Sequence, residues 1–79
     1  MRVRDAVFTQ FREVARQQDR PLSELGDSLP LADSGLDSLC LAIIVARLED
    51  TLGVDPFATS DDIPTTIGDF VALYERALA

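Results

Sequence analysis

Apolar residues recur at helical spacing in three stretches of the chain, separated by segments without a sustained period. The first stretch covers residues 3–17, and its apolar positions are Val3, Val7, Phe8, Phe11, Val14 and Ala15. Residues three and four positions apart lie on one face of a helix. The pattern therefore predicts a first amphipathic helix, with its arginines on the opposite, solvated face.

The second stretch, residues 38–52, predicts a helix with a strongly apolar core face. That face contains Leu41, Ile44, Val45, Leu48 and Leu52. At roughly 100° per residue, the opposite side contains Leu39, Ile43, Ala46 and Asp50. We therefore expect Leu39 and Ile43 to face water one turn apart, and Gly53 fits the helix exit.

The third stretch begins at Pro64-Thr65-Thr66, where either threonine can cap a helix and Asp69 favours the helix dipole. Its core positions are Ile67, Phe70, Val71, Tyr74 and Leu78. Tyr74 is interpreted as a core aromatic residue with its hydroxyl at the rim. Before this helix, Val54 or Phe57 is expected to plug the bundle, and residues 60–63 are expected to form one short helical turn.

The segment from Gln18 to Asp37 has no regular period, which is long for a loop in a small domain. A short turn can open at Pro21 and end at Gly26. The loop also contains several leucines that we expect to pin it across the molecule: Leu22, Leu25, Leu29, Leu31 and Leu36. The predicted fold is all-α, a small antiparallel bundle of three main helices and one short helix, with a long loop between the first two.

The composition indicates one folded domain over residues 1–79, with 47% hydrophobic and 27% charged residues. No apolar run approaches the roughly 20 residues that a membrane span needs, and the N-terminus lacks the apolar stretch of a signal peptide. We therefore expect a cytoplasmic protein without membrane insertion. The single cysteine, Cys40, excludes an internal disulfide.

Charge is distributed unevenly along the chain, whose net charge is −7. Residues 1–20 carry a net charge of +2 and residues 21–79 a net charge of −9. This balance disfavours binding to nucleic acid and to anionic membranes. The acidic region is either a solvated surface or a docking field for basic partners.

The absence of histidine argues against an enzyme. It excludes a Ser-His-Asp triad, a Cys-His pair and histidine metal sites. Cys40 lies in an apolar helix with no base in view and is interpreted as a small packing or surface residue. Asp61 and Asp62 lack the ligand spacing of a calcium loop, so no metal site is predicted.

The stretch from Asp33 to Leu39, with the sequence DSGLDSL, combines a glycine turn with one serine hydroxyl before the second helix. Gly35 can adopt a backbone conformation that other residues resist. Either Asp37 or Ser38 can accept hydrogen bonds from the first free N–H groups of the helix. A serine at such a position is usually only a cap, so this motif alone predicts helix initiation.

Leu36-Asp37-Ser38-Leu39 lies after a leucine-bearing loop and before a helix that ends near Gly53, and in this setting it resembles the attachment site of acyl and peptidyl carrier proteins. The resemblance covers nearly the whole chain. It implies a discrete, monomeric carrier in which Ser38 receives 4'-phosphopantetheine from coenzyme A through a phosphopantetheinyl transferase. The terminal thiol of this arm would carry an acyl or aminoacyl thioester between a loading ligase and downstream processing enzymes.

The residues around Ser38 also indicate which class of carrier protein the chain resembles. Discrete fatty acid carriers usually have acidic residues two and five positions after the serine, where this chain has Cys40 and Ile43. Residues 45–48 and the Pro-Thr start of the last helix look more like peptidyl or polyketide carriers, which favours a specialised pathway. The resemblance also suggests a partner-binding face, with Ile63 on the acyl-chain side; the residues are Asp37, Leu39, Ile43, Ala46, Arg47 and Ile63.

Two alternatives to this interpretation remain. One is a housekeeping carrier of fatty acid synthesis. The other is a non-catalytic helical adaptor that binds a partner through Leu39 and Ile43 and uses Ser38 only as a cap.

Overall fold

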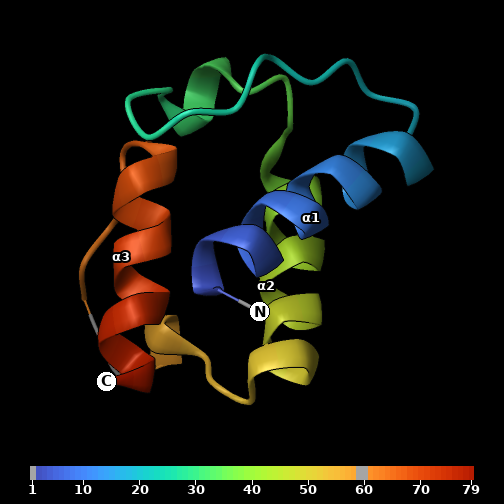
Figure 1. Cartoon of the computed structure of the whole chain (residues 1–79). Coiled ribbons are helices and arrows are strands. Elements are labelled where there is room, and N and C mark those ends of the chain that lie inside the picture. Colours follow the sequence, from blue (N-terminus) through green and yellow to red (C-terminus); the bar gives the residue numbers. More distant parts are fainter. Residues whose placement is uncertain (1, 59–60) are drawn as a thin grey trace.

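Three α-helices and two short 3-10 turns make up the fold in the computed structural model, which describes residues 2–58 and 61–79 (Figure 1). The elements in chain order are α1 (Val3–Gln17), η1 (Leu31–Asp33), α2 (Ser38–Leu52), η2 (Pro56–Ala58) and α3 (Ile67–Leu78). The all-α prediction and the three main helices are confirmed. None of the described helices is both long enough and apolar enough to cross a membrane.

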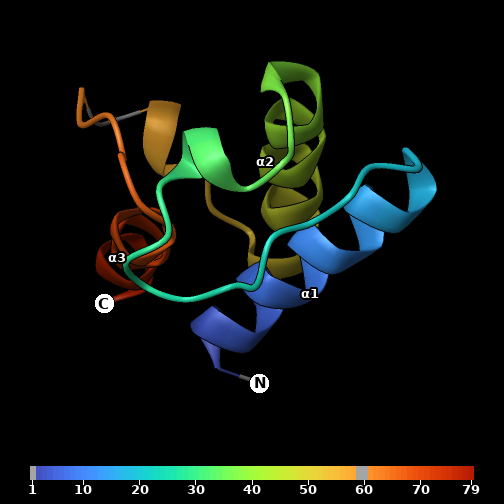
Figure 2. The same ribbon diagram turned by 90° about the horizontal axis from the view of Figure 1, so that it is seen from above.

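The helices do not form the simple antiparallel arrangement that we expected. α1 runs obliquely across α2, while α2 and α3 both run from the end with the long loop toward the opposite end (Figure 1). The chain between α2 and α3 returns along the molecule, which allows the two helices to share a direction. Figure 2 shows the long loop draped over the end where α2 and α3 begin.

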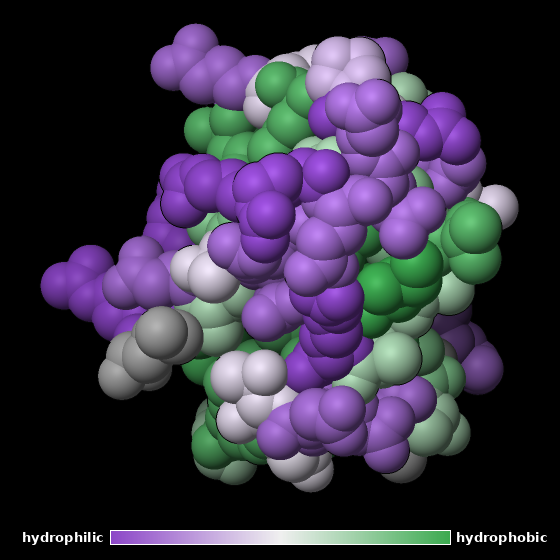
Figure 3. Space-filling view, turned by 90° about the vertical axis from the view of Figure 1, so that its right-hand side faces the viewer, coloured by the Kyte–Doolittle hydropathy of each residue, from purple (hydrophilic) through white to green (hydrophobic). Residues whose placement is uncertain are grey.

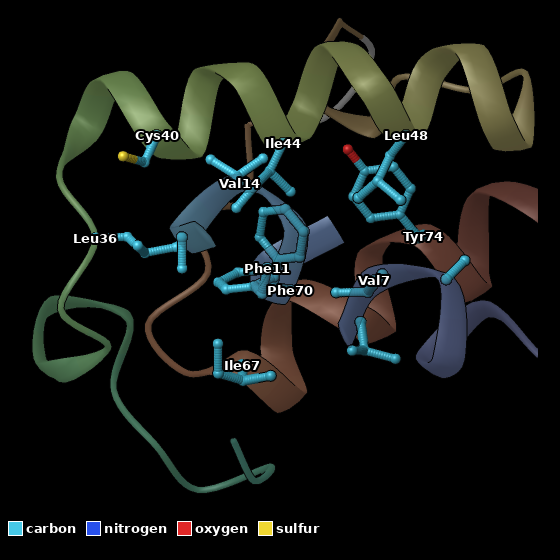
Figure 4. Packing of buried hydrophobic residues seen from close by; sticks show 13 residues of the cluster. Val7, Phe11, Val14, Leu36, Cys40, Ile44, Leu48, Ile67, Phe70 and Tyr74 are labelled. Carbon is cyan, nitrogen blue, oxygen red and sulfur yellow. The ribbon is translucent and has the colours of Figure 1, made fainter. Parts of the chain in front are cut away.

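The core lies where the three helices meet (Figure 4). The rings of Phe11 and Phe70 pack edge to face with centroids 5.5 Å apart. Phe57, from η2, lies 5.8 Å from the Phe70 ring and 6.2 Å from that of Tyr74, and so plugs the bundle as predicted. Such aromatic pairs add to the stabilisation from burial alone.

The buried stripe of α2 differs from the predicted one. It contains Cys40, Ile44 and Leu48, whereas Leu41 and Val45 are only half-buried. Ile43 is also half-buried and packs against the core, so the prediction that it faces water is wrong. Hydrophobic periodicity misplaced this face because α2 packs against α1 with its stripe rotated toward Ile43.

The long loop is pinned by its leucines, as predicted: Leu36 is buried, and Leu22, Leu25, Leu29 and Leu31 pack partly buried against the core. The expected turn between Pro21 and Gly26 does not form. Instead, the Ser23 N–H donates to the Ser34 carbonyl oxygen across 2.9 Å, so this stretch bonds to another part of the loop. The loop also reaches α3, because the Ile67 N–H donates to the Leu29 carbonyl oxygen across 2.9 Å.

The end of the chain confirms the predicted third helix and corrects its details. Thr66 is the cap, and it forms a reciprocal capping box with Asp69. The short turn expected at 60–63 lies earlier, at η2, where Pro56 begins a 3-10 turn; Ser60 is outside the described residues, and 61–63 are irregular. Tyr74 is fully buried, so its hydroxyl does not lie at the rim, and Leu78 is exposed.

Candidate functional site

Ser38 is the first residue of α2, and its side chain is exposed. The capping role belongs to Asp37, whose Oδ1 accepts a hydrogen bond from the Cys40 N–H across 2.9 Å. This settles which of the two residues caps the helix. The Ser38 hydroxyl is therefore not engaged in holding the first turn and is available for chemistry.

The backbone before Ser38 is held in one conformation by a glycine and a buried serine. Gly35 has φ of 94°, and a Cβ there would collide with the carbonyl oxygen of Pro21, so only glycine fits. Ser34 is completely buried, and its hydroxyl donates to the Leu31 carbonyl oxygen across 2.7 Å. Together with buried Leu36, these contacts fix the position from which α2 starts.

Two titratable groups beside Ser38 have shifted pKa values. The pKa of Asp37 is lowered, first by the backbone hydrogen bond from Cys40 and also by the nearby charge of Arg20. The carboxylate is therefore anionic at neutral pH. Burial is the main cause that raises the pKa of the Cys40 thiol, which is only 1% exposed. The structure thus places Cys40 in the core as a packing residue.

An apolar groove of about 380 Å³ opens beside Ser38. It lies between α2, η1, η2 and the segment before α3, and Ser38 provides the hydroxyl among otherwise apolar side chains. The lining residues are Leu31, Ser38, Leu41, Ala42, Val45, Phe57, Ile63, Pro64 and Phe70. Leu41 and Val45, which the hydrophobic pattern places in the core, are half-buried because they line this groove.

The structure divides the predicted partner-binding residues among different surfaces. Asp37, the cap of α2, and Leu39 and Ala46, within that helix, are exposed, with Leu39 62% exposed. Ile63 is 89% exposed and lines the groove together with Ser38. The other two residues, Ile43 and Arg47, lie on the flank of α2, where Ile43 packs against the core and Arg47 donates to Gln17 of α1.

Two residues near Ser38 were missed by sequence analysis. Ala42 is exposed and lines the groove one turn after Ser38, but an alanine does not stand out in a hydrophobic pattern. The Arg20 Nη2 atom lies 2.8 Å from the Asp37 Oδ2 atom. The two residues are 17 positions apart across an irregular loop, so no periodicity could have paired them.

The acidic pair near the third helix shows no sign of a metal site. Among residues 2–58 and 61–79, no group of three or more potential protein ligands is gathered. Asp62 instead lies 3.4 Å from the guanidinium group of Arg76.

A comparison of the chain with protein-family models identifies its family. Residues 9–73 match the model described as "phosphopantetheine attachment site". The matched range includes Ser38, all of α2 and parts of α1 and α3. No curated protein matches the chain, and no solved structure does.

Proposed function

The chain belongs to the phosphopantetheine-attachment-site family of carrier proteins, and on this premise we propose that Ser38 is the residue that carries the 4'-phosphopantetheine group. A member of this family acts as a tethered substrate for other enzymes and not as a catalyst. The prosthetic group supplies a terminal thiol, which holds the cargo as a thioester.

The exposed Ser38 hydroxyl at the start of α2 is the observation that carries the proposal. Because Asp37 caps the helix, modification of Ser38 removes no hydrogen bond that the first turn needs. The free N–H groups and the positive end of the helix dipole favour an anion at this position. The residues present therefore fit a phosphodiester on Ser38.

The contribution of the chain itself is to position the arm. The fixed turn at Gly35 and the capped start of α2 hold the attachment oxygen at the surface. A tether at this point raises the effective concentration of the cargo at the site of a docked enzyme. One carrier has to leave each enzyme in turn, so its contacts with them should be weak and reversible.

We propose that the exposed side of α2 around Ser38 is the surface that partner enzymes contact. These partners are a phosphopantetheinyl transferase, a loading ligase and the enzymes that process the cargo. Leu39, Ala42 and Ala46 present small or apolar side chains there, beside the Asp37 carboxylate. Ile63, on the far side of the groove, extends the same surface.

The groove is proposed to receive the apolar part of a cargo attached through Ser38. Its volume of about 380 Å³ and its apolar lining support this role. Ser38 itself contributes to the lining, so an arm attached there begins at the mouth of the groove.

We further propose that residues 1–79 form a single, monomeric carrier domain of the cytoplasm that serves a specialised pathway. Such a pathway would build a polyketide, a nonribosomal peptide or an unusual acyl chain. The support comes from α2, where Cys40 is buried and Ile43 half-buried. A carboxylate at position 40 would be buried in the core. This helix is therefore not shaped to present acidic side chains at positions 40 and 43, as discrete fatty acid carriers usually do.

Loading of Ser38 can be tested by incubating the protein with coenzyme A and a promiscuous phosphopantetheinyl transferase. Intact-mass measurement should show one phosphopantetheine on the wild type and none on Ser38→Ala. Since Asp37 is the cap, the substitution should change the free energy of unfolding by less than about 0.5 kcal/mol.

Ser28→Ala provides the matched control, because Ser28 is also an exposed serine but lies in the long loop and not at the start of α2. This variant should be loaded as fully as the wild type. Equal loading of the Ser38→Ala variant would refute the assignment of the site.

A further inference from the structure

Arg20 lies three residues beyond Gln17, the last residue of α1, and hydrogen bonds at the end of that helix fix its backbone. The Arg20 N–H donates to the Ala15 carbonyl oxygen across 2.8 Å, and the Asp19 N–H donates to that of Arg16 across 3.2 Å. With Asp19 in the left-handed region at φ of 53°, this is the Schellman arrangement that ends many helices. Arg20 is therefore not part of a free loop, although it lies beyond the helix.

The residues after Arg20 are held against the segment that leads to Ser38. The Ser23 hydroxyl donates to the Asp33 carbonyl oxygen across 2.7 Å, and the Pro21 carbonyl lies against Gly35. The backbone of Arg20 is thus fixed on one side by α1 and on the other by the approach to α2. This position brings its guanidinium group to Asp37, the residue before Ser38.

The other ion pairs of the described chain lie elsewhere. They are Arg4 with Asp27, Arg16 with Glu13, and Arg76 with Asp62. The face on which α1 ends is dominated by hydrophilic side chains (Figure 3). Among these ion pairs, the pair of Arg20 with Asp37 is the one beside the attachment site. The Arg20 side chain is 48% exposed.

A phosphodiester on Ser38 would bring a second negative charge next to the Asp37 carboxylate, in a chain whose net charge is already −7. Like charges this close repel each other unless a cation lies near both. The guanidinium group has five N–H donors in a planar fork that suits phosphate oxygens. One of its nitrogens donates to Asp37, which leaves donors for a further anion.

On the basis of the proposed attachment at Ser38, we propose that Arg20 binds the phosphodiester of the phosphopantetheine arm and orients its base. Arg20 would then be a positioning residue for the arm. In the unmodified protein it binds Asp37, and after modification it is shared between the carboxylate and the phosphate.

The test compares unmodified and phosphopantetheine-loaded forms of the wild type, Arg20→Gln and Arg20→Lys. The change in Tm on loading should be lower in Arg20→Gln than in the wild type by about 2–5 °C, because an exposed pair of charges is worth a fraction of a kcal/mol. The phosphorus NMR signal of loaded Arg20→Gln should also be shifted from that of the loaded wild type. Lysine keeps the charge without the fork, so Arg20→Lys should give an intermediate phosphorus shift.

Arg16→Gln is the matched control, because it removes the same positive charge as Arg20→Gln. Arg16 is also exposed, but it pairs with Glu13. Its change in Tm on loading and its phosphorus signal should equal those of the wild type. If Arg20 only holds Asp37, Arg20→Gln will lower Tm equally in both forms and leave the phosphorus signal unchanged, which would overturn the proposal. Should Arg20→Gln unfold, the phosphorus signal of loaded Arg20→Lys decides alone: a signal that differs from the wild type supports the proposal, and an identical signal overturns it.

Intact mass, measured before melting, separates the two proposals. A protein that is never loaded contradicts the assignment of Ser38. A protein that is fully loaded but insensitive to Arg20 contradicts only the inference about Arg20.

Discussion

Tyr74 illustrates at the residue scale how the core accepts one unfavourable group. Its hydroxyl is buried with no hydrogen-bond partner among the described residues, and burial is the main cause that raises its pKa, so it stays neutral. An unsatisfied buried hydroxyl costs about 1–3 kcal/mol. Tyr74→Phe keeps the ring contacts with Phe70 and Phe57 and should therefore raise the free energy of unfolding, measured in urea, by about 1 kcal/mol.

Tyr74→Leu is the control for this prediction, because it removes the hydroxyl together with the ring contacts. It should lower the free energy of unfolding. A clear loss of stability in Tyr74→Phe would mean that the hydroxyl has a partner and that the interpretation of this site is wrong.

At the scale of the elements, the sequence predicted what local chemistry determines. The bounds of α1, a threonine cap for the last helix and the exit at Gly53 all follow from short-range rules, which left open whether Thr65 or Thr66 is the cap. The rotation of α2 did not follow, because packing against another helix decides which of several apolar stripes is buried. The irregular loop was harder still, since contacts such as Arg20 with Asp37 depend on tertiary structure alone.

Leu39 and Ile43 provide a direct test of the faces of α2. Leu39→Glu should change the free energy of unfolding by less than about 0.5 kcal/mol, because its side chain is largely exposed. Ile43→Glu should cost about 1–3 kcal/mol, because it places a carboxylate against the core. The same Leu39→Glu protein should be loaded more slowly by a transferase if this surface binds partners.

Urea denaturation of the two variants measures the difference. Equal stabilities would contradict the assignment of the faces. An unchanged loading rate in Leu39→Glu would remove Leu39 from the partner surface.

The whole molecule carries its negative charge mainly in residues 21–79, whose net charge is −9. Arginines of the first 20 residues offset part of it through pairs such as Arg4 with Asp27 and Arg20 with Asp37. Salt weakens these few attractions and also the more numerous repulsions among the acids. We therefore expect Tm to rise between low and moderate salt, and a constant or falling Tm would contradict this balance.

The central claim is that the hydroxyl at the start of α2 carries the arm, and locating the modification within the chain tests it most directly. Trypsin should release residues 17–47 as one peptide, since it does not cut between Arg20 and Pro21, and this peptide contains Ser23, Ser28, Ser34 and Ser38. Fragmentation of that peptide by tandem mass spectrometry, after loading from coenzyme A, should place the phosphopantetheine on Ser38. A modification on any of the other three serines, or an unmodified peptide in the presence of an active transferase, would contradict the account.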